Sequence, residues 1–283
     1  MKPRVMSLVL FTCMVGLLIA PNQVNFLNSA ISILAVALGA GAAGTLNMWY
    51  ESDLDKLMTR TCLRPIPSGK VSKNQALLFG IFLTILSITL LYNTSNFISA
   101  FLLFFTIFFY FFIYTVWLKK RTPQNIVIGG AAGALPPVIG WTIATGSLSI
   151  EPLILFTIIF LWTPSHFWAL SLYKSQDYKK AKIPMLPVIS GVGKTKINIF
   201  IYSLLMIPTI FAAYYYVIDS RLFFIPALLS TLYYNYLCLS LLKVKGHRNT
   251  NLIAKRIFVY SIFYLFFIFL LILINNFYLI FYG

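Results

Sequence analysis

Apolar runs of about 18 to 25 residues recur along the whole chain, and this feature constrains the fold more than any other. A helix of about 20 apolar residues crosses the hydrocarbon core of a bilayer, which is about 30 Å thick. The composition agrees, because only 10% of the residues are charged, whereas a soluble domain carries about 25%. The sequence therefore predicts an all-α fold, a polytopic membrane helical bundle.

The apolar runs predict about nine transmembrane helices in a single integral membrane domain, residues 1–283. Lys2 and Arg4 before a short apolar run are also typical of a signal peptide, but no small-x-small cleavage site precedes Pro21, which favours an uncleaved first span. The spans are expected at residues 5–21, 27–48, 75–93, 97–118, 125–145, 152–172, 196–217, 221–242 and 256–279.

The charge distribution predicts how the bundle is oriented. The chain has 22 Lys and Arg residues against 6 Asp and Glu, a net charge of +16. All the basic residues except Arg221 lie near the N-terminus or in the connections after spans two, four, six and eight. This is the positive-inside pattern, so the charge indicates a bacterial-type inner membrane and not a nucleic-acid partner. The N-terminus is expected in the cytoplasm and the C-terminus outside.

An acidic stretch follows the second span, in NMWYESDLDKLMTRTCLRPIPSGK at 47–70. Asn47, Glu51 and Asp55 are spaced i, i+4 and i+8, which stacks their side chains on one helix face, with Asp53 pointing elsewhere. Like charges at this spacing repel unless a cation lies between them. Because Mg²⁺ prefers oxygen ligands, the pattern predicts a magnesium site at Asn47, Glu51 and Asp55. The alternative is a set of solvated charges beside a helix end.

Basic residues come directly after these acids. Arg60, Arg64 and Lys70 lie in the loop TRTCLRPIPSGK. Each one alone is explained by the positive-inside pattern. Next to carboxylates that hold a metal, however, guanidinium and ammonium groups are the donors that a diphosphate needs. The three are therefore candidate diphosphate-binding residues.

Part of this loop recurs later in the chain at a constant offset. An offset of four spans preserves orientation, so the two stretches predict a parallel internal repeat, about 27–145 and 150–270; chance alignment is the alternative. The second loop keeps one acid among several lysines. The recurring positions are Asp55, Pro65, Ser68 and Gly69, and then Asp177, Pro187, Ser190 and Gly191.

The motif N-x-x-x-(D/E)-x-x-x-D after span two resembles the first aspartate-rich motif of the intramembrane aromatic prenyltransferase superfamily. Three longer stretches are similar to one branch of it, which farnesylates haem b. They are MWYESDLDKLMTRTCLRPIPSG at 48–69, KRTPQNIVIGGAAGALPPVIGW at 120–141 and FLWTPSHFWALSLYKSQDYKKAKIPMLPV at 160–188. The likeness runs nearly end to end and is weakest in spans three, four and seven to nine.

The resemblance implies a bundle with cytoplasmic helix-loop caps after spans two and six, and an active site at that face. It implies transfer of a farnesyl group from farnesyl diphosphate to a vinyl group of haem b, with Mg²⁺ as cofactor. Water adds in the same reaction and diphosphate leaves. Asn47, Glu51 and Asp55 would then be catalytic as metal ligands, with Asp177 in place of the family's second acidic motif. A haem-modifying oxidase or terminal oxidase assembly is the expected partner beyond the lipid bilayer.

A haem acceptor draws attention to His166 in span six. An ionisable residue in a span usually faces the bundle interior. His166 is either a hydrogen-bonded core residue or a haem-facing one, as an iron ligand or a partner of a propionate. Lys174 and Lys182 are candidate partners of the propionates, although the positive-inside pattern also explains both.

Two alternatives stay open at this point. The stretch GGAAGALPPVIGW, with Pro136 and Pro137, is typical of a discontinuous helix such as transporters use. The scarcity of intramembrane acids favours an enzyme over a coupled carrier. Within the enzyme class, a quinone-precursor aromatic acid such as 4-hydroxybenzoate is the other acceptor. The lone Asp177, where that class carries several acids, favours haem.

Overall fold

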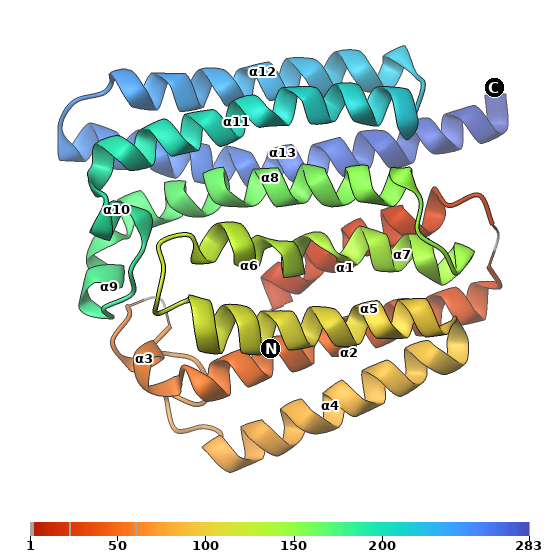
Figure 1. The fold of residues 1–283 in the computed structure, drawn as a ribbon, viewed down its shortest axis with the longest axis horizontal. Helices are drawn as coiled ribbons and strands as arrows, with labels where there is room; N and C mark the ends of the chain where they lie inside the picture. Colours follow the sequence, from red (N-terminus) through yellow and green to blue (C-terminus); the bar gives the residue numbers. More distant parts are fainter. Residues whose placement is uncertain (1–2, 23, 60, 283) are drawn as a thin grey trace.

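The computed structural model describes residues 3–22, 24–59 and 61–282, and its elements in that part are helices joined by turns. Long helices lie side by side with their axes roughly parallel, and short helices cover one end of the bundle (Figure 1). Eight of the described helices are long and apolar enough to cross a membrane, and Met6–Leu18 forms a shorter apolar one.

Most of the long helices lie where the spans were predicted, but α11 and α13 begin earlier than predicted, at Gly191 and His247 and not at residues 196 and 256. In chain order they are α1 (Pro3–Leu18), α2 (Phe26–Tyr50), α3 (Ser52–Lys56), α4 (Lys73–Thr94), α5 (Phe97–Phe108), η1 (Phe109–Leu118), α6 (Asn125–Ala134), α7 (Pro136–Thr145), α8 (Ile150–Tyr173), α9 (Ser175–Lys180), α10 (Leu186–Ile189), α11 (Gly191–Tyr216), α12 (Arg221–Lys243) and α13 (His247–Tyr282).

The first helix is shorter than its predicted span, residues 5–21. It ends at Leu18 and has 16 residues, which give about 24 Å of helix, against the roughly 30 Å of a hydrocarbon core. Pro21 explains the early end, because a proline disfavours helical backbone at the residue before it.

The fourth predicted span, residues 97–118, is one rod with two kinds of helix. Its second half, η1, is a π-helix of 10 residues. There the Lys119 amide donates to the Tyr114 carbonyl at 2.9 Å, five residues back. A π-helical segment is rare and frequently lies at a functional site, and this one carries Thr115 and leads into Lys119.

The fifth span is discontinuous, as Pro136 and Pro137 predict. α6 ends at Ala134 and α7 begins at Pro136, with prolines in its first turn. A proline has no N–H to bond backward and its ring clashes with the preceding turn, so the helix is interrupted at Leu135.

Two apolar cores hold the helices together. The last four long helices, α8, α11, α12 and α13, pack around one core, in which Trp168, Tyr234 and Tyr264 are fully buried. α2, α4, α5 and η1 pack around the other, together with α1 and α7. α1, α6 and α7 lie between the two groups (Figure 1). The layout places the C-terminal ends of α2 and α8 at the same end of the bundle.

Short helices and loops cover that end, which we call the acidic end because Glu51, Asp53, Asp55 and Asp177 lie there. α3 follows α2, and α9 and α10 follow α8 (Figure 1). An apolar cluster joins the two coverings, so the predicted helix-loop caps after spans two and six are confirmed. The buried members of this cluster are Met58, Ile126, Tyr178, Ala181, Ile183 and Met185.

The two recurring loop stretches share one backbone feature. Gly69 has φ +77° and Gly191 has φ +80°, in the left-handed region that favours glycine. Both glycines follow a serine and come shortly before or at the start of a long helix, α4 and α11. The parallel repeat itself stays a prediction.

α1 and α7 make the closest helix contact in the bundle's middle layer. A Cβ atom at Gly140 would lie 1.9 Å from the Cys13 carbonyl oxygen, and one at Gly16 would lie 2.1 Å from that of Pro137. Small residues at such positions let two backbones touch inside a membrane. The contact therefore requires glycine on both helices.

We expect Gly140→Ala to lower the free energy of unfolding by about 1–3 kcal/mol, because the added methyl group forces the two backbones apart. Thermal unfolding in detergent measures the change. Gly133→Ala is the matched control, since a Cβ at Gly133 has no neighbour within 4 Å. Equal melting temperatures for the two variants would show that the contact is not tight.

Candidate active site

The three residues predicted to share a helix face lie together at the acidic end. Asn47, Glu51 and Asp55 are 1%, 3% and 2% exposed. Glu51 joins α2 to α3, and its amide still donates to the Asn47 carbonyl at 3.0 Å, as the Asp55 amide does to the Glu51 carbonyl at 2.8 Å. The helical spacing thus continues across the junction. Glu51 and Asp55 are therefore buried acids and not solvated loop charges.

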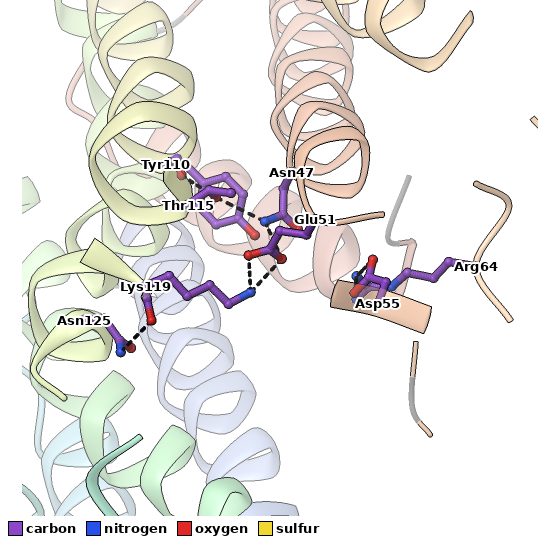
Figure 2. A network of polar contacts seen from close by, with 8 residues as sticks. All are labelled: Asn47, Glu51, Asp55, Arg64, Tyr110, Thr115, Lys119 and Asn125. Atoms are coloured by element: carbon purple, nitrogen blue, oxygen red, sulfur yellow. Dashed lines mark hydrogen bonds and ion pairs between the residues drawn. The ribbon is translucent and has the colours of Figure 1, made fainter. Parts of the chain in front are cut away.

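Glu51 is paired with a lysine from another helix. Lys119 Nζ lies 2.6 Å from each carboxylate oxygen of Glu51. Asn47 Nδ2 donates to Glu51 Oε2 at 3.0 Å and to Thr115 Oγ1 at 3.1 Å. Figure 2 shows the resulting network between α2 and η1. Both oxygens of Glu51 are thus held by the same ammonium group, and the carboxylate is almost fully buried.

Asp55 is paired with a different cation. Arg64 Nη1 donates to Asp55 Oδ1 at 2.9 Å and to Oδ2 at 2.7 Å. Thr61 Oγ1 donates to the Asp55 carbonyl at 3.0 Å and so fixes the loop that carries Arg64. Figure 2 shows the two carboxylates turned apart, Glu51 toward Lys119 and Asp55 toward Arg64. Each buried acid is therefore neutralised by its own basic residue.

This donor set fits Mg²⁺ only with help from a substrate. No group of three His, Cys, Asp or Glu side chains in the described part of the chain could hold a metal ion. Two carboxylates one helical turn apart suit the usual mode of Mg²⁺, which takes one or two carboxylates and fills its other positions with phosphate oxygens and water. Lys119 and Arg64 are close enough to serve such a phosphate group.

Asp53 is separate from this set, as its helical position predicts. It is exposed and pairs with Lys73 at 2.7 Å and with Lys56 at 3.6 Å. The hydrogen bond from Lys73 lowers the pKa of the Asp53 carboxyl below its ordinary value. Asp53 and Asp55 therefore form a natural comparison: two aspartates in one short helix, one solvated and one buried.

The two acidic loops touch each other at Asp177. Thr59 Oγ1 donates to Asp177 Oδ1 at 3.1 Å, so the lone acid of the second loop holds the first loop in place. Asp177 is paired with Thr59 and not with the cations of Asp55 or Glu51, and its predicted catalytic role stays a prediction.

The other basic residues predicted to bind substrate do not pair with the buried carboxylates in the described part of the chain. Lys70, Lys174 and Lys182 are exposed. Lys174 lies over the Tyr173 ring, 5.8 Å from its centroid. Arg60 lies outside the described residues. Among the residues described, Arg64 and Lys119 are the basic groups that pair with the two buried carboxylates.

His166 is packed between α8 and α13. Its ring stacks between Trp162, at 4.3 Å, and Phe258, at 4.7 Å. Ser261 Oγ lies 2.6 Å from His166 Nδ1 and donates its single proton to the Phe258 carbonyl at 2.7 Å. The contact with Ser261 occupies Nδ1, and Nε2 has no hydrogen-bond partner among the described residues. A histidine held in this way through one nitrogen is suited to bind a metal through the other.

Lys119 and Thr115 were missed by sequence reasoning. Lys119 lies in the basic connection after span four, where the positive-inside pattern explains it without a specific role. The predicted topology could have indicated that Lys119 lies near Glu51, because the connections after spans two and four are on the same side of the membrane. The π-helical turn that brings Thr115 and Lys119 to α2 has no signature in the sequence.

The chain and its fold are similar to known proteins. The chain is 65% identical over 276 residues to Protoheme IX farnesyltransferase of Pelagibacter ubique (strain HTCC1062), covering 98% of this chain and 91% of that one. The fold is similar to that of a digeranylgeranylglyceryl phosphate synthase, with TM-score 0.78, 18% identity and coverage of 95% and 92%. It is also similar to a UbiA homologue from Archaeoglobus fulgidus bound to GPP and Mg²⁺, with TM-score 0.65, 18% identity and coverage of 95% and 97%.

The predicted superfamily resemblance is confirmed. Residues 9–262 match the model of the UbiA prenyltransferase family. Together with the apolar helices, this match identifies an integral membrane protein. The chain therefore belongs to the UbiA prenyltransferase family.

Proposed function

We propose that the protein transfers the farnesyl group of farnesyl diphosphate to a vinyl group of haem b, giving haem O and diphosphate. The observation that carries this proposal is the 65% identity, over 98% of the chain, to a protein named Protoheme IX farnesyltransferase. The buried Asn47–Glu51–Asp55 face supports a prenyl diphosphate donor. So does the A. fulgidus homologue of the same fold, which was solved with GPP and Mg²⁺.

The bond changes define what the site must do. The bond between farnesyl C1 and the diphosphate oxygen breaks, and both electrons leave with the diphosphate. The outer vinyl carbon of haem b forms a new bond to C1, and water adds to the inner vinyl carbon and loses a proton. The largest need is to stabilise charge on the departing diphosphate, which fixed donors in a site shielded from water do best.

Glu51 and Asp55, with Asn47, are the residues that would hold Mg²⁺. When bound, Mg²⁺ supplies Lewis-acid stabilisation of the diphosphate oxygens. Lys119 and Arg64 leave their carboxylate partners in part to donate to the same oxygens. Exchanging one anion for another keeps each buried cation paired, which limits the cost of the change. Arg60 and Lys70 are further candidate donors from the same loop, and Asp177 positions that loop through Thr59.

The acceptor half of the site is proposed around α8. His166 offers Nε2 to the haem iron, since histidine is a common axial ligand. Lys174 and Lys182, both exposed at the acidic end, would receive the anionic propionates. The active site faces the cytoplasm in a bacterial-type inner membrane, with the N-terminus inside and the C-terminus outside, because the basic connections lie on this side. The product would pass to a haem-modifying oxidase or to assembly of a terminal oxidase.

We expect Asp55→Asn to reduce haem farnesylation by about 10²–10³-fold, because the variant loses a buried carboxylate that the metal needs. Purified protein is supplied with farnesyl diphosphate, haem b and Mg²⁺, and mass spectrometry follows the mass gain of a hydroxyethylfarnesyl group. Asp53→Asn, the solvated neighbour in the same helix, should keep wild-type activity.

Full activity in Asp55→Asn would remove Asp55 from the metal site. If the wild-type protein prenylates 4-hydroxybenzoate but not haem, the acceptor assignment is wrong. Solute flux in vesicles without any prenyl transfer would favour the transporter alternative.

Lys119→Met should lower kcat/KM for farnesyl diphosphate by about 10²-fold, because a donor to the diphosphate is lost. Steady-state kinetics measure this. The change also leaves Glu51 unpaired, and breaking a buried pair costs about 3–5 kcal/mol, so Lys119→Arg is the companion variant. It keeps the cation and should restore folding and part of the activity. Lys120→Met, at the exposed adjacent position, is the control and should leave kinetics unchanged.

His166→Gln should weaken the binding of haem b by about tenfold or more, because an iron ligand is worth at least one charge-assisted hydrogen bond. Haem titration followed by the Soret band measures affinity and reports the change in iron ligation. His247→Gln is the control, since His247 is the chain's other histidine and is exposed. An unchanged Soret spectrum in His166→Gln would assign His166 to the packed core alone.

A further inference from the structure

A cavity of about 470 Å³ lies at the end of the bundle opposite the acidic end. Three connections meet there, those between α1 and α2, α7 and α8, and α11 and α12 (Figure 1). Polar side chains make up much of its lining, and Glu151 is the one charged residue among the described residues that line it. The polar members are Asn22, Trp141, Thr145, Ser147, Ser149 and Glu151.

Three polar atoms around this cavity are buried and have no hydrogen-bond partner among the described residues. They are Trp141 Nε1, Ser149 Oγ and Glu151 Oε2. Trp141 is only 6% exposed. An unpaired buried polar group costs about 1–3 kcal/mol, and more if it is charged. Three of them around one cavity therefore indicate a ligand that supplies the missing partners.

The helix terminus does not explain these groups. Ser149 is the N-cap of α8, a position at which serine usually accepts a bond from the first turn, yet its side chain makes no such bond. Glu151 lies in the first turn, where the helix dipole favours an acid. The dipole stabilises the charge of Glu151 but supplies no donor to Oε2, and it has no bearing on Trp141.

The unpaired atoms specify the chemistry of the ligand. Glu151 needs a cation that carries N–H donors, and Ser149 can accept from the same group. Trp141 Nε1 can only donate, so the ligand must also present an acceptor oxygen. A primary ammonium group close to a phosphate oxygen meets all three needs. A trimethylammonium group does not, because it has no N–H.

The position of the cavity favours a lipid as the source of this group. It lies where the apolar helices end, at the depth of the polar headgroups. Trp141 and the exposed Tyr216 are aromatic residues of the type enriched at that depth. We infer that this cavity binds the headgroup of a phosphatidylethanolamine lipid, with its ammonium on Glu151 and Ser149 and its phosphate on Trp141. The site is independent of the farnesyl transfer proposed above.

The test uses the full-length protein in nanodiscs of phosphatidylcholine alone or with added phosphatidylethanolamine. A ligand that binds only the folded state raises the melting temperature, so the wild type should melt higher with the ethanolamine lipid. Native mass spectrometry should show that lipid retained. Glu151→Gln and Trp141→Phe should reduce the retained lipid by about tenfold, the loss expected for one charge-assisted hydrogen bond.

Asp219→Asn is the matched control, because Asp219 is the other acid at this end and does not line the cavity. It should keep the lipid-dependent shift, which separates site binding from the bulk effect of the bilayer. Free ethanolamine phosphate, added to phosphatidylcholine nanodiscs, distinguishes the sources: an equal shift supports the site with a soluble ligand. The proposal is overturned if all the variants respond to the lipid as the wild type does, or if Mg²⁺ alone gives the Glu151-dependent shift.

Discussion

Burying a carboxylate is unfavourable unless a cation is buried with it, and the acidic end of this bundle is organised around two such acids. Glu51 takes its cation from the rod formed by α5 and η1, and Asp55 takes its cation from the loop that follows α3. The need for these partners fixes where η1 lies against α2 and how the loop folds back. The same pairs keep the site electrically balanced, so a diphosphate and its metal find anions and cations already placed around them.

The sequence was most informative where one physical rule dominates. The requirement that a lipid-embedded backbone satisfy its own hydrogen bonds made the helices and most of their ends predictable, and Pro136 located the break between α6 and α7. Helical spacing also separated the buried Asp55 from the solvated Asp53. The contact of Lys119 with Glu51 was beyond this reasoning, because it depends on a π-helical turn and on the packing of η1 against α2. Arg64 was predicted as a donor, but its pairing with Asp55 follows from the loop's fold and not from spacing.

The two expected descriptions of His166, a packed core residue and a haem-facing one, do not exclude each other. It is a packed, hydrogen-bonded histidine, held by Ser261 and by two aromatic rings. The contact with Ser261 occupies Nδ1 and leaves Nε2 without a hydrogen-bond partner among the described residues. Rigid support of this kind is what a binding group needs, since a side chain already held in place loses little entropy when a ligand arrives. Packing and ligand binding are therefore compatible roles here.

The contact between α1 and α7 has a consequence for how the protein is made. α1 comes first in the chain, yet the surface it packs against, around Pro137 and Gly140, belongs to the fifth span. The first helix to be synthesised therefore gains this contact only after four more spans have entered the membrane, and it gains its contact with α13 only after the last one. α1 is also shorter than a bilayer is thick, so its stable position depends on that late partner. The middle layer of the bundle therefore forms late in assembly, although one of its helices is the first to be synthesised.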